Sequence, residues 1–513
     1  MLVKTFGSAV YGVDAITITI EVNVLDGAHI FVVGLADGAV RESIRRVESA
    51  IKSNGYRMPR TKLVVSLAPA DIKKSGSAFD LAIAIGTLAA SSQIQNPEVL
   101  KEFVIMGELN LDGAVKAIKG ALPIAITARK DGFRGLILPL QNSREAGMIT
   151  GLNVYGVSHI EEVIRFFKDA STLKPVMVNA RDIFFHSQED SDSDFSDVRG
   201  QENIKRSLEI AAAGGHNAIL IGPPGAGKTM LAKRLPTILP PLTLREALET
   251  TKIHSVAGKL PENSTLISKR PFRSPHHTIS DVALVGGGIL PQPGEISLAH
   301  NGVLFLDELP EFKRTVLEVM RQPIEERKVT ISRASIAVDY PAGFMLIASM
   351  NPCPCGFYNH PEKICSCPPG AVQRYLNKIS GPLLDRIDLH VEVTPVPFAE
   401  MSSQTKMETS DIIRTRVIAA REIQTQRFAA SPGYYCNAQM SSKLLRQICV
   451  LDTSCAALIR SAMTKFNLSA RAYDRILKVS RTIADLGQSK IIKPEHLAEA
   501  IQYRTLDRES WAG

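Results

Sequence analysis

Apolar and polar side chains follow two distinct patterns along the first 170 residues of the chain. Residues 17–24, TITIEVNV, alternate with a period of two, which predicts a strand. Residues 39–56 carry apolar side chains at helical spacing and end at Asn54, just before a glycine, which predicts a helix and its end. Apolar runs predict three more elements: a strand over 61–71, a helix over 80–91 and a strand over 135–139. We therefore expect one mixed α and β domain over residues 1–170.

A polar, acidic stretch interrupts these patterns. Residues 186–197, HSQEDSDSDFSD, contain almost no apolar side chain, so they lack the face that a packed helix or strand needs to bury. We expect a linker over residues 171–197.

After this stretch, strand and helix patterns alternate up to about residue 395. Strands are predicted over 217–222, 302–309 and 342–351, and helices over 228–239 and 312–326. Helices between strands at this spacing are typical of a mostly parallel α/β sheet, which we expect over residues 198–395. From about residue 405 onward no strand pattern is visible, and four segments at helical spacing predict a helical domain within residues 396–513.

Composition adds expectations about size, location and partners. A chain of 513 residues is too long for one ordinary hydrophobic core. Its content of 45% hydrophobic and 22% charged residues is typical of a soluble globular protein. The N-terminus shows no secretory pattern and no apolar run approaches the ~20 residues of a membrane helix, so we expect a cytoplasmic protein without membrane contact. The net charge of +8 suits a polyanionic partner such as nucleic acid, although many basic proteins bind none.

The segment GPPGAGKT, residues 222–229, follows the apolar strand AILI, precedes a predicted helix and fits G-x-x-x-x-G-K-[ST]. Glycines allow backbone N–H groups to surround phosphates, and the helix N-terminus adds its positive end. Lys228 would reach the β- and γ-phosphates of ATP, and Thr229 would bind Mg²⁺. The alternative is a glycine-rich turn without a ligand. The predicted nucleotide contacts are Gly222, Pro223, Pro224, Gly225, Ala226, Gly227, Lys228, Thr229 and Met230.

Acidic and polar residues end the next two predicted strands. GVLFLDEL places Asp307 and Glu308 at the carboxyl end of its strand, where ligands bind in open α/β sheets. Asp307 would hold Mg²⁺ through water, and Glu308 would polarise the attacking water as a general base. An exposed acidic pair at a strand end is the alternative. Asn351 ends the following strand, where it either starts a turn or orients the attacking water.

Together, the P-loop, LFLDEL, the strand ending in Asn351, GPLLDRIDLH (381–390) and LSARAYDRIL (468–477) resemble an AAA+ ATPase. More narrowly, RPFRSPHHTISDVALVGGG (270–288) and NPCPCG (351–356) are similar to the ComM/YifB family of magnesium-chelatase-like AAA+ ATPases, along essentially the full chain. The resemblance implies ATP and Mg²⁺ as cofactors, catalytic roles for Lys228, Asp307 and Glu308, and a homo-oligomeric ring, which we expect to be a hexamer.

The same resemblance implies roles for one asparagine and two arginines. Asn351 would be sensor 1, Arg386 the arginine finger on a neighbouring subunit's nucleotide, and Arg471 sensor 2 on the helical lid. Mobile guanidinium groups stabilise charge that develops on the transferred γ-phosphate. Without the family, either arginine is more often a surface ion pair, because most arginines are exposed.

The spacing from Lys228 to Asp307 is long for a bare AAA+ core and implies an insertion, for which residues 270–294 fit. ERKVTISRASIAVDYPAG (326–343) fits a hairpin before sensor 1, and both elements face the central pore in this family. The candidate DNA contacts are Arg273, His276, His277, Lys328 and Arg333. The basic ones would bind phosphate rather than read bases. The histidine pair could instead hold a metal or pack in a turn.

Residues 1–170 resemble the proteolytic domain of Lon proteases, chiefly through residues 107–139. That family cleaves peptides with a Ser–Lys dyad. Here the position of the nucleophile falls on Ala78, with Ser77 one residue away, and the position of the lysine falls on Leu122 or Pro123. Because a nucleophile without a base is not activated, we expect a non-proteolytic fold of the Lon and ribosomal S5 type. Its role would be assembly, DNA guidance or partner binding.

Four of the seven cysteines, Cys353, Cys355, Cys365 and Cys367, form two C-x-C pairs directly after Asn351. The spacing differs from the C-x-x-C of thioredoxin-like motifs, which argues against redox chemistry. Four thiolates could close a tetrahedral zinc site, with His360 as a spare ligand, although C-x₂₋₄-C is the usual spacing. A reduced, metal-free loop is the alternative.

Three functions follow from these features. The resemblance implies a DNA motor that migrates branches and extends heteroduplex when imported single strands recombine during natural transformation, with single-stranded and branched DNA as partners. A metal-insertion or protein-remodelling ATPase of the magnesium chelatase type is the second, although the Lon-like domain argues against it. An ATP-dependent protease is the third, and it depends on the dyad that the sequence lacks.

Overall fold

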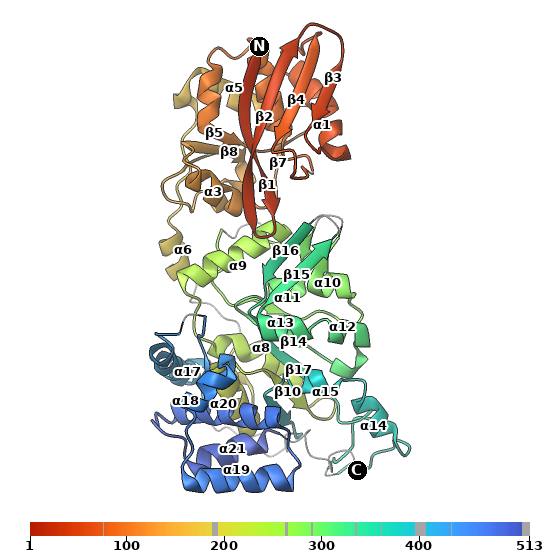
Figure 1. Cartoon of the computed structure of the whole chain (residues 1–513), viewed down its shortest axis with the longest axis vertical. Helices are drawn as coiled ribbons and strands as arrows, with labels where there is room; N and C mark the ends of the chain where they lie inside the picture. The colour runs from red at the N-terminus through yellow and green to blue at the C-terminus, as the bar shows by residue number, and fades with distance from the viewer. Residues whose placement is uncertain are drawn as a thin grey trace.

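The computed structural model describes residues 1–74, 76–186, 193–261, 265–288, 291–333, 336–360, 362–395, 407–431 and 433–504. Figure 1 shows an N-terminal domain at one end of the long axis, an α/β domain at the centre and helices α17 to α21 beside the lower part of that domain. No helix in the described part of the chain is long and apolar enough to cross a membrane.

A seven-stranded sheet forms the N-terminal domain, in the order β3-β4-β2-β1-β5-β8-β9. Its strands are β1 (Leu2–Tyr11), β2 (Asp14–Leu25), β3 (Ile30–Val33), β4 (Lys62–Ala68), β5 (Phe103–Ile105), β8 (Gly135–Pro139) and β9 (Asn153–Val157). Its helices are α1 (Gly38–Ser53), α2 (Asp80–Ala90), α3 (Ala121–Lys130), α4 (Leu140–Ala146) and α5 (Ile160–Lys168), and β6 (Glu108–Leu109) pairs with β7 (Val115–Lys116). All five elements predicted here from the sequence are confirmed.

Helix α2 forms a large part of the hydrophobic core of this domain. Every residue from Asp80 to Ala90 is buried, as expected for a helix that is apolar on all sides. At Gly86 a Cβ atom would lie 2.8 Å from the side chain of Val22, so glycine allows the helix to lie directly on β2. Asp80, the one charged residue of the helix, is paired with Arg46 of α1 at 2.7 Å.

The central sheet has five parallel strands in the order β11-β14-β17-β10-β18. They are β10 (Ala218–Ile221), β11 (Phe272–Arg273), β14 (Val303–Leu306), β17 (Met345–Met350) and β18 (Leu389–Glu392), with helices α7 (Glu202–Gly214), α8 (Lys228–Ile238) and α9 (Leu244–Ala257). The three predicted strands and the parallel arrangement are confirmed. The strands β11 and β18 were not predicted: β11 has only two residues, and the LHVE of β18 contains polar residues that interrupt an apolar run.

The predicted helix over 312–326 is divided into α12 (Arg314–Glu318) and α13 (Arg321–Glu326). Pro323 has no N–H to bond to the carbonyl of Val319, which explains the interruption. The insertion over 270–294 contains β11, α10 (Asp281–Val285), β12 (Gly286–Gly287) and β13 (Gln292–Pro293), and α11 (Glu295–Leu298) follows it. The predicted hairpin is confirmed as β15 (Lys328–Arg333) paired antiparallel with β16 (Ile336–Pro341).

The C-terminal region is helical, as predicted. Two short helices, α14 (Ala371–Leu376) and α15 (Gly381–Leu384), precede it, and the region itself contains α17 (Ser410–Arg427), α18 (Ser442–Ile448), α19 (Thr453–Lys465), α20 (Ala470–Leu486) and α21 (Pro494–Gln502). The sequence prediction missed α17, whose buried residues Ile413, Val417, Ala420 and Gln424 recur at helical spacing. One apolar core joins these helices to the central sheet.

Part of the range expected as a linker is folded. Helix α6 (Ala180–His186) buries Phe184, and Phe195 is fully buried in the core of the central domain. Residues 187–192, the most acidic part of the predicted linker, lie outside the described residues.

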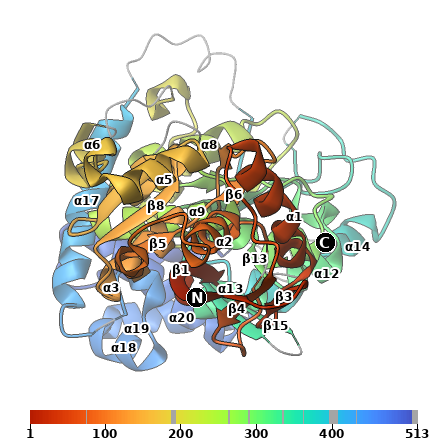
Figure 2. The ribbon, with the colours of Figure 1, turned by 90° about the horizontal axis from the view of Figure 1, so that it is seen from above.

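The N-terminal domain lies on the central domain (Figure 2) through α3 and α9. Buried Glu145 accepts the N–H of Leu122 in the first turn of α3 at 2.9 Å, and it also accepts the hydroxyl of Ser255 in α9. Gly120 donates its N–H to the carbonyl of Ser255 at 3.1 Å. Burial raises the pKa of Glu145, although Ser255 and Leu122 lower it.

Replacing Glu145 tests this junction. The Leu122 N–H has no acceptor within its own helix turn, so Glu145→Ala leaves a buried donor without a partner at a cost of about 1–3 kcal/mol. Glu145→Gln keeps an oxygen acceptor and removes the buried charge, and we expect it to retain most of the stability. Because the pKa of Glu145 is raised in the folded state, the wild-type protein loses stability as the pH rises above the pKa that this carboxyl has in the unfolded chain. The glutamine variant has no titrating group at this position, so its stability does not change in this way. Urea unfolding of both variants measures this, and equal losses would contradict the assignment.

Candidate nucleotide-binding site

The loop over residues 222–227 connects β10 to α8 at the carboxyl end of the central sheet. Gly225 and Gly227 both have φ of +79°, in the left-handed region that favours glycine. At Gly222 a Cβ atom would lie 2.3 Å from the carbonyl oxygen of Val393, so only glycine fits beside β18. The loop therefore ends in the N-terminus of α8, where free N–H groups and the helix dipole attract phosphate. Met230, the last predicted contact, lies in the first turn of α8 and is partly exposed.

The side chain of Lys228 is buried and donates three hydrogen bonds. Its acceptors are the carbonyls of Gly222 at 2.6 Å and Pro223 at 2.9 Å and the Oδ1 atom of Asn351 at 3.1 Å. Burial lowers the pKa of Lys228, whereas the carboxylates of Asp307 and Glu308 act in the opposite direction. The fold thus brings together two predicted site residues that are 123 positions apart in the sequence.

The two predicted Mg²⁺ ligands are in direct contact. The hydroxyl of Thr229 donates to Oδ2 of Asp307 at 2.7 Å, across 78 positions of sequence. A hydroxyl and a carboxylate oxygen in contact at the end of a P-loop are the ligand types that Mg²⁺ takes beside a nucleotide, so the residues present fit the ion.

Ser349 is a site residue that the sequence analysis missed. Its hydroxyl donates to Oδ1 of Asp307, the oxygen not used by Thr229. Leu306 of β14 pairs with Ala348 of the parallel strand β17. The residues that follow them, Asp307 and Ser349, therefore lie beside each other. A serine two positions before Asn351 in an apolar strand was the available signal.

Glu308 has an unusual backbone conformation for a site residue. Its φ of +53° lies in the left-handed region, and such residues cluster at functional sites. The side chain is 57% exposed, and its Oε2 atom lies 3.5 Å from Nδ1 of His277. The rings of His277 and His276 lie 4.1 Å apart. His277, predicted as a DNA contact, is therefore a neighbour of the predicted general base.

Gln201 also contacts the P-loop and was not predicted. Its Nε2 atom donates to the carbonyl of Ala226 at 2.8 Å, from a left-handed position before α7. One glutamine at a helix start carries no signal in a single sequence.

The two predicted arginines lie near each other and not on the P-loop. Arg386 pairs with Glu325 of α13 at 2.7 Å and is 14% exposed, and its Nε atom is buried without a partner among the described residues. Arg471, in the first turn of α20, is 69% exposed and pairs with Asp385 at 3.2 Å. Among the described contacts, neither guanidinium group bonds to the residues of the P-loop.

Most candidate DNA contacts already have acidic partners. Arg273 makes two hydrogen bonds to Glu295, at 2.5 and 2.8 Å, and Lys328 pairs with Asp339 at 3.1 Å. An open pocket of about 350 Å³ is lined by Arg273, Ser274, Pro275, His276, Thr278, Ile279 and Glu295. The backbone of Arg333 ends β15, and its side chain lies outside the described residues.

The structure does not place a lysine at the position expected for a Lon-type dyad. Leu122 and Pro123 lie in the first turn of α3, and Leu122 is fully buried. The hydroxyl of Ser77 donates to Glu108, and the ammonium group of Lys74 donates to the carbonyl of Pro69. Burial lowers the pKa of Lys74.

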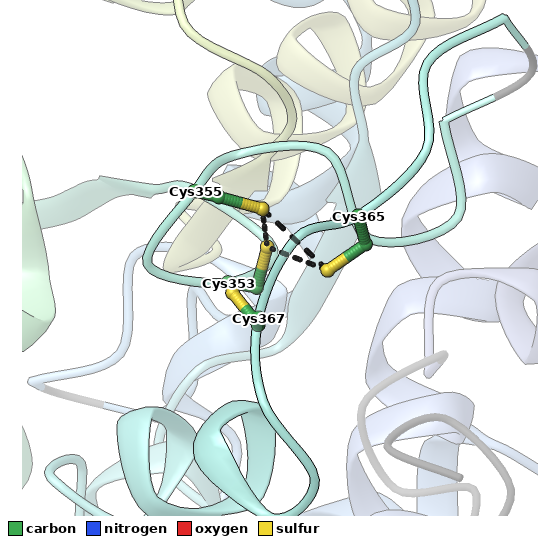
Figure 3. Close-up of side chains that lie close together, drawn as sticks. All are labelled: Cys353, Cys355, Cys365 and Cys367. Atoms are coloured by element: carbon green, nitrogen blue, oxygen red, sulfur yellow. Dashed lines mark hydrogen bonds between the residues drawn. The ribbon is translucent and has the colours of Figure 1, made fainter.

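The four clustered cysteines converge. Their Sγ atoms all lie within 4.8 Å of one another, at the carboxyl edge of the sheet beyond Asn351 (Figure 3). His360, the spare ligand in the sequence analysis, is not part of this group: its Nδ1 atom accepts the N–H groups of Glu362 and Lys363, both at 3.1 Å.

Three family models match the chain. "Magnesium chelatase, subunit ChlI" matches residues 194–401, "Subunit ChlI of Mg-chelatase" matches residues 20–142, and "Magnesium chelatase, subunit ChlI C-terminal" matches residues 407–504. A shorter similarity, 31% identity over 154 residues, connects 27% of this chain with 26% of Lon protease 2 of Bacillus subtilis.

Two relatives match along nearly their whole length. The chain is 45% identical over 512 residues to the uncharacterized protein YifB of Escherichia coli, which covers 98% of this chain and 96% of YifB. It is 43% identical over 511 residues to the competence protein ComM of Haemophilus influenzae, covering 99% and 98%. With the P-loop geometry described above, these matches show that the chain belongs to the ComM/YifB family of magnesium-chelatase-like AAA+ proteins, a membership that implies ATP and Mg²⁺ at this site.

Proposed function

We propose that the chain is a ring-forming AAA+ ATPase that uses ATP hydrolysis to move on DNA, as a branch-migration helicase that extends heteroduplex during natural transformation. The observation that carries the ATPase part is the contact of Thr229 with Asp307 beside the P-loop. The DNA part is supported by 43% identity, over 99% of this chain, to a relative named as a competence protein. Single-stranded and branched DNA are the proposed substrates, and the protein would act in the cytoplasm.

The residues of the site have distinct tasks in this proposal. Bound ATP and Mg²⁺ would supply the reactive phosphoryl group and the charge that polarises it. Lys228 would exchange its carbonyl acceptors for phosphate oxygens, and Thr229 and Asp307 would hold the ion. Glu308 would accept a proton from the attacking water, which Asn351 would orient. Each of these side chains lies at the same edge of the central sheet.

A ring of identical subunits, which we propose to be a hexamer, is supported by the position of Arg386. Its guanidinium group makes no described contact with the P-loop of its own chain, and its Nε atom has no partner among the described residues. An arginine that acts on a neighbour's nucleotide explains why the group lies away from its own P-loop. Arg471, whose side chain is 69% exposed, would approach the nucleotide as sensor 2 after it releases Asp385.

The insertion and the β15–β16 hairpin are the proposed DNA-facing elements. Arg273, His276, His277, Lys328 and Arg333 are the proposed contacts. The carboxylates paired with Arg273 and Lys328 have to be displaced by phosphate. This costs little at Lys328, because exposed ion pairs contribute about 0.2–1 kcal/mol, and more at Arg273, whose partner Glu295 is only 14% exposed. Contacts of this kind hold the backbone without reading sequence.

A metal-insertion or protein-remodelling ATPase is the second candidate, because all three matching family models carry the chelatase name. The N-terminal model includes residues 20–142, so the presence of that domain does not by itself separate the two functions. Stimulation of ATP hydrolysis by DNA rather than by a partner protein separates them.

The N-terminal domain is proposed to be a non-proteolytic fold of the Lon and ribosomal S5 type that serves assembly, DNA guidance or partner binding. Because Leu122 and Pro123 replace the expected lysine, we expect the wild-type protein to hydrolyse no peptide above background in a fluorogenic peptide assay with ATP. Hydrolysis that disappears in Ser77→Ala would contradict this.

Branch migration is tested on a mobile four-way junction with labelled strands. We expect strand exchange by the wild-type protein with ATP, and none with a non-hydrolysable analogue. Glu308→Gln removes the general base and is expected to reduce ATP hydrolysis by about 10²–10⁴-fold while ATP still binds. Equal strand exchange with ATP and with the analogue would exclude a motor.

His277 is expected to restrain Glu308 in the absence of DNA. His277→Ala removes a partly exposed partner of the carboxylate worth up to ~1 kcal/mol, so basal ATP hydrolysis should rise, by no more than about fivefold. His276→Ala is the matched control, because His276 touches the neighbouring ring but is not paired with Glu308. A lower basal rate in His277→Ala alone would show that the pairing supports catalysis instead of restraining it.

A further inference from the structure

The cysteine cluster lies outside the ATP-binding residues but is attached to them. Cys353 and Cys355 follow β17 directly, and Cys365 and Cys367 lie in an extended segment before α14. Figure 3 shows the four side chains pointing toward one another from these two segments. Cys353 is fully buried, and the other three are half-buried.

The distances between the sulfur atoms match a shared ion. Three of them are 3.3 Å between Cys353 and Cys355, 3.7 Å between Cys353 and Cys365, and 3.5 Å between Cys355 and Cys365, and the sulfur of Cys367 lies within 4.8 Å of the other three. A disulfide requires about 2.05 Å. Bonds of about 2.3 Å from four sulfurs to one zinc place the sulfurs about 3.8 Å apart in a tetrahedron. The observed spacing is thus that of ligands around a single ion.

The backbone around Cys353 supports a bound thiolate. The N–H of Tyr358 donates to Sγ of Cys353 at 3.3 Å, and the N–H of Gly356 donates to the carbonyl of Cys353 at 3.0 Å. Gly356 has φ of +85°, which closes the turn after the first pair. The backbone of this turn therefore fixes the position of the Cys353 sulfur through one hydrogen bond to the sulfur and one to the carbonyl.

Few contacts hold the residues just before the second pair. The N–H groups of Glu362 and Lys363 donate to His360, but Glu362, Lys363 and Ile364 are exposed, Ile364 to 93%, so these three residues bury almost no apolar surface. Short segments without a core depend on a cross-link such as a metal ion for a defined shape.

We propose that Cys353, Cys355, Cys365 and Cys367 bind one structural Zn²⁺ ion, and that this zinc clip, residues 353–367, supports the P-loop. A tetrahedral set of four sulfurs selects zinc over the harder divalent ions. With all four ligands from the protein, the site is closed and has no position for a substrate.

The zinc clip contacts the nucleotide site at two points. A Cβ atom on Gly356 would lie 2.6 Å from Cδ of Pro224, so the first turn of the clip rests directly on the P-loop. Asn351, two residues before Cys353, accepts the hydrogen bond from Lys228. Loss of the ion therefore loosens the support of both Pro224 and Asn351. This inference does not depend on whether DNA or protein is the substrate.

Metal analysis of the full-length protein tests the site. Protein purified without a histidine tag is expected to contain about one zinc per chain by mass spectrometry, and Cys365→Ser/Cys367→Ser to contain none. Ser366→Ala, in the same segment, and Cys449→Ala, a buried cysteine outside the cluster, are the matched controls and are expected to retain zinc. Less than about one-tenth of a zinc per chain, or iron in its place, would overturn the assignment.

Two further measurements do not depend on how the double variant folds. Replacement of zinc by Co²⁺ in the wild-type protein is expected to give the visible absorption of a tetrahedral cobalt–thiolate centre, and its absence would overturn the four-sulfur site.

Zinc release by a thiol reagent is expected to weaken binding of a fluorescent ATP analogue about tenfold or less, because the phosphate contacts themselves remain. Unchanged affinity after complete release would overturn the coupling to the P-loop.

Discussion

The parallel register of β10, β17 and β14 is the constraint on which the nucleotide site depends. Ile221 pairs with Met350, and Leu306 pairs with Ala348, so the three strands end at nearly the same level. The P-loop, Asn351 and Asp307 each follow one of these strand ends, and side chains far apart in the sequence therefore meet at one edge. A shift of one residue in β17 would turn Ser349 and Asn351 to the wrong faces of the sheet.

The helical region is joined to this sheet by a buried polar network, not only by apolar contacts. His216 bonds to Asp388 at 2.9 Å and to Thr482 of α20 at 2.8 Å, and Arg475, also on α20, bonds to Asp388 at 2.8 Å. Burial would raise the pKa of Asp388, but Arg475 and His216 hold it well below its usual value. Breaking a buried pair of this kind costs about 3–5 kcal/mol. We infer that α20 moves together with the sheet end at Asp388, because separation would leave these charges unpaired.

The sequence was sufficient for the local elements and for residues defined by a motif. Periodicity and apolar runs predicted α1, α2 and the central strands β10, β14 and β17 because each buries one face or all faces of a regular element. The P-loop and Asp307 were predictable because a strand end fixes where their side chains lie. Contacts between distant segments were not predictable: the carboxylates paired with Arg273 and Lys328, and the pair of His277 with Glu308, depend on how separate elements pack.

The dipeptide Asp385-Arg386 connects two parts of the molecule that the proposed motor has to coordinate. Arg386 is held by Glu325, three residues before the start of the hairpin strand β15, and Asp385 is held by Arg471 on α20. If Arg386 reaches a neighbour's phosphate, it has to release Glu325, and the neighbouring ion pair at Asp385 is then free to rearrange. The exposed pair of Arg471 and Asp385 costs little free energy to break. The half-buried pair of Arg386 and Glu325 costs more, so it determines the free energy that the rearrangement requires. A neighbour's nucleotide would thereby change the contacts at the base of the hairpin and the pairing of Arg471 on α20 in one step.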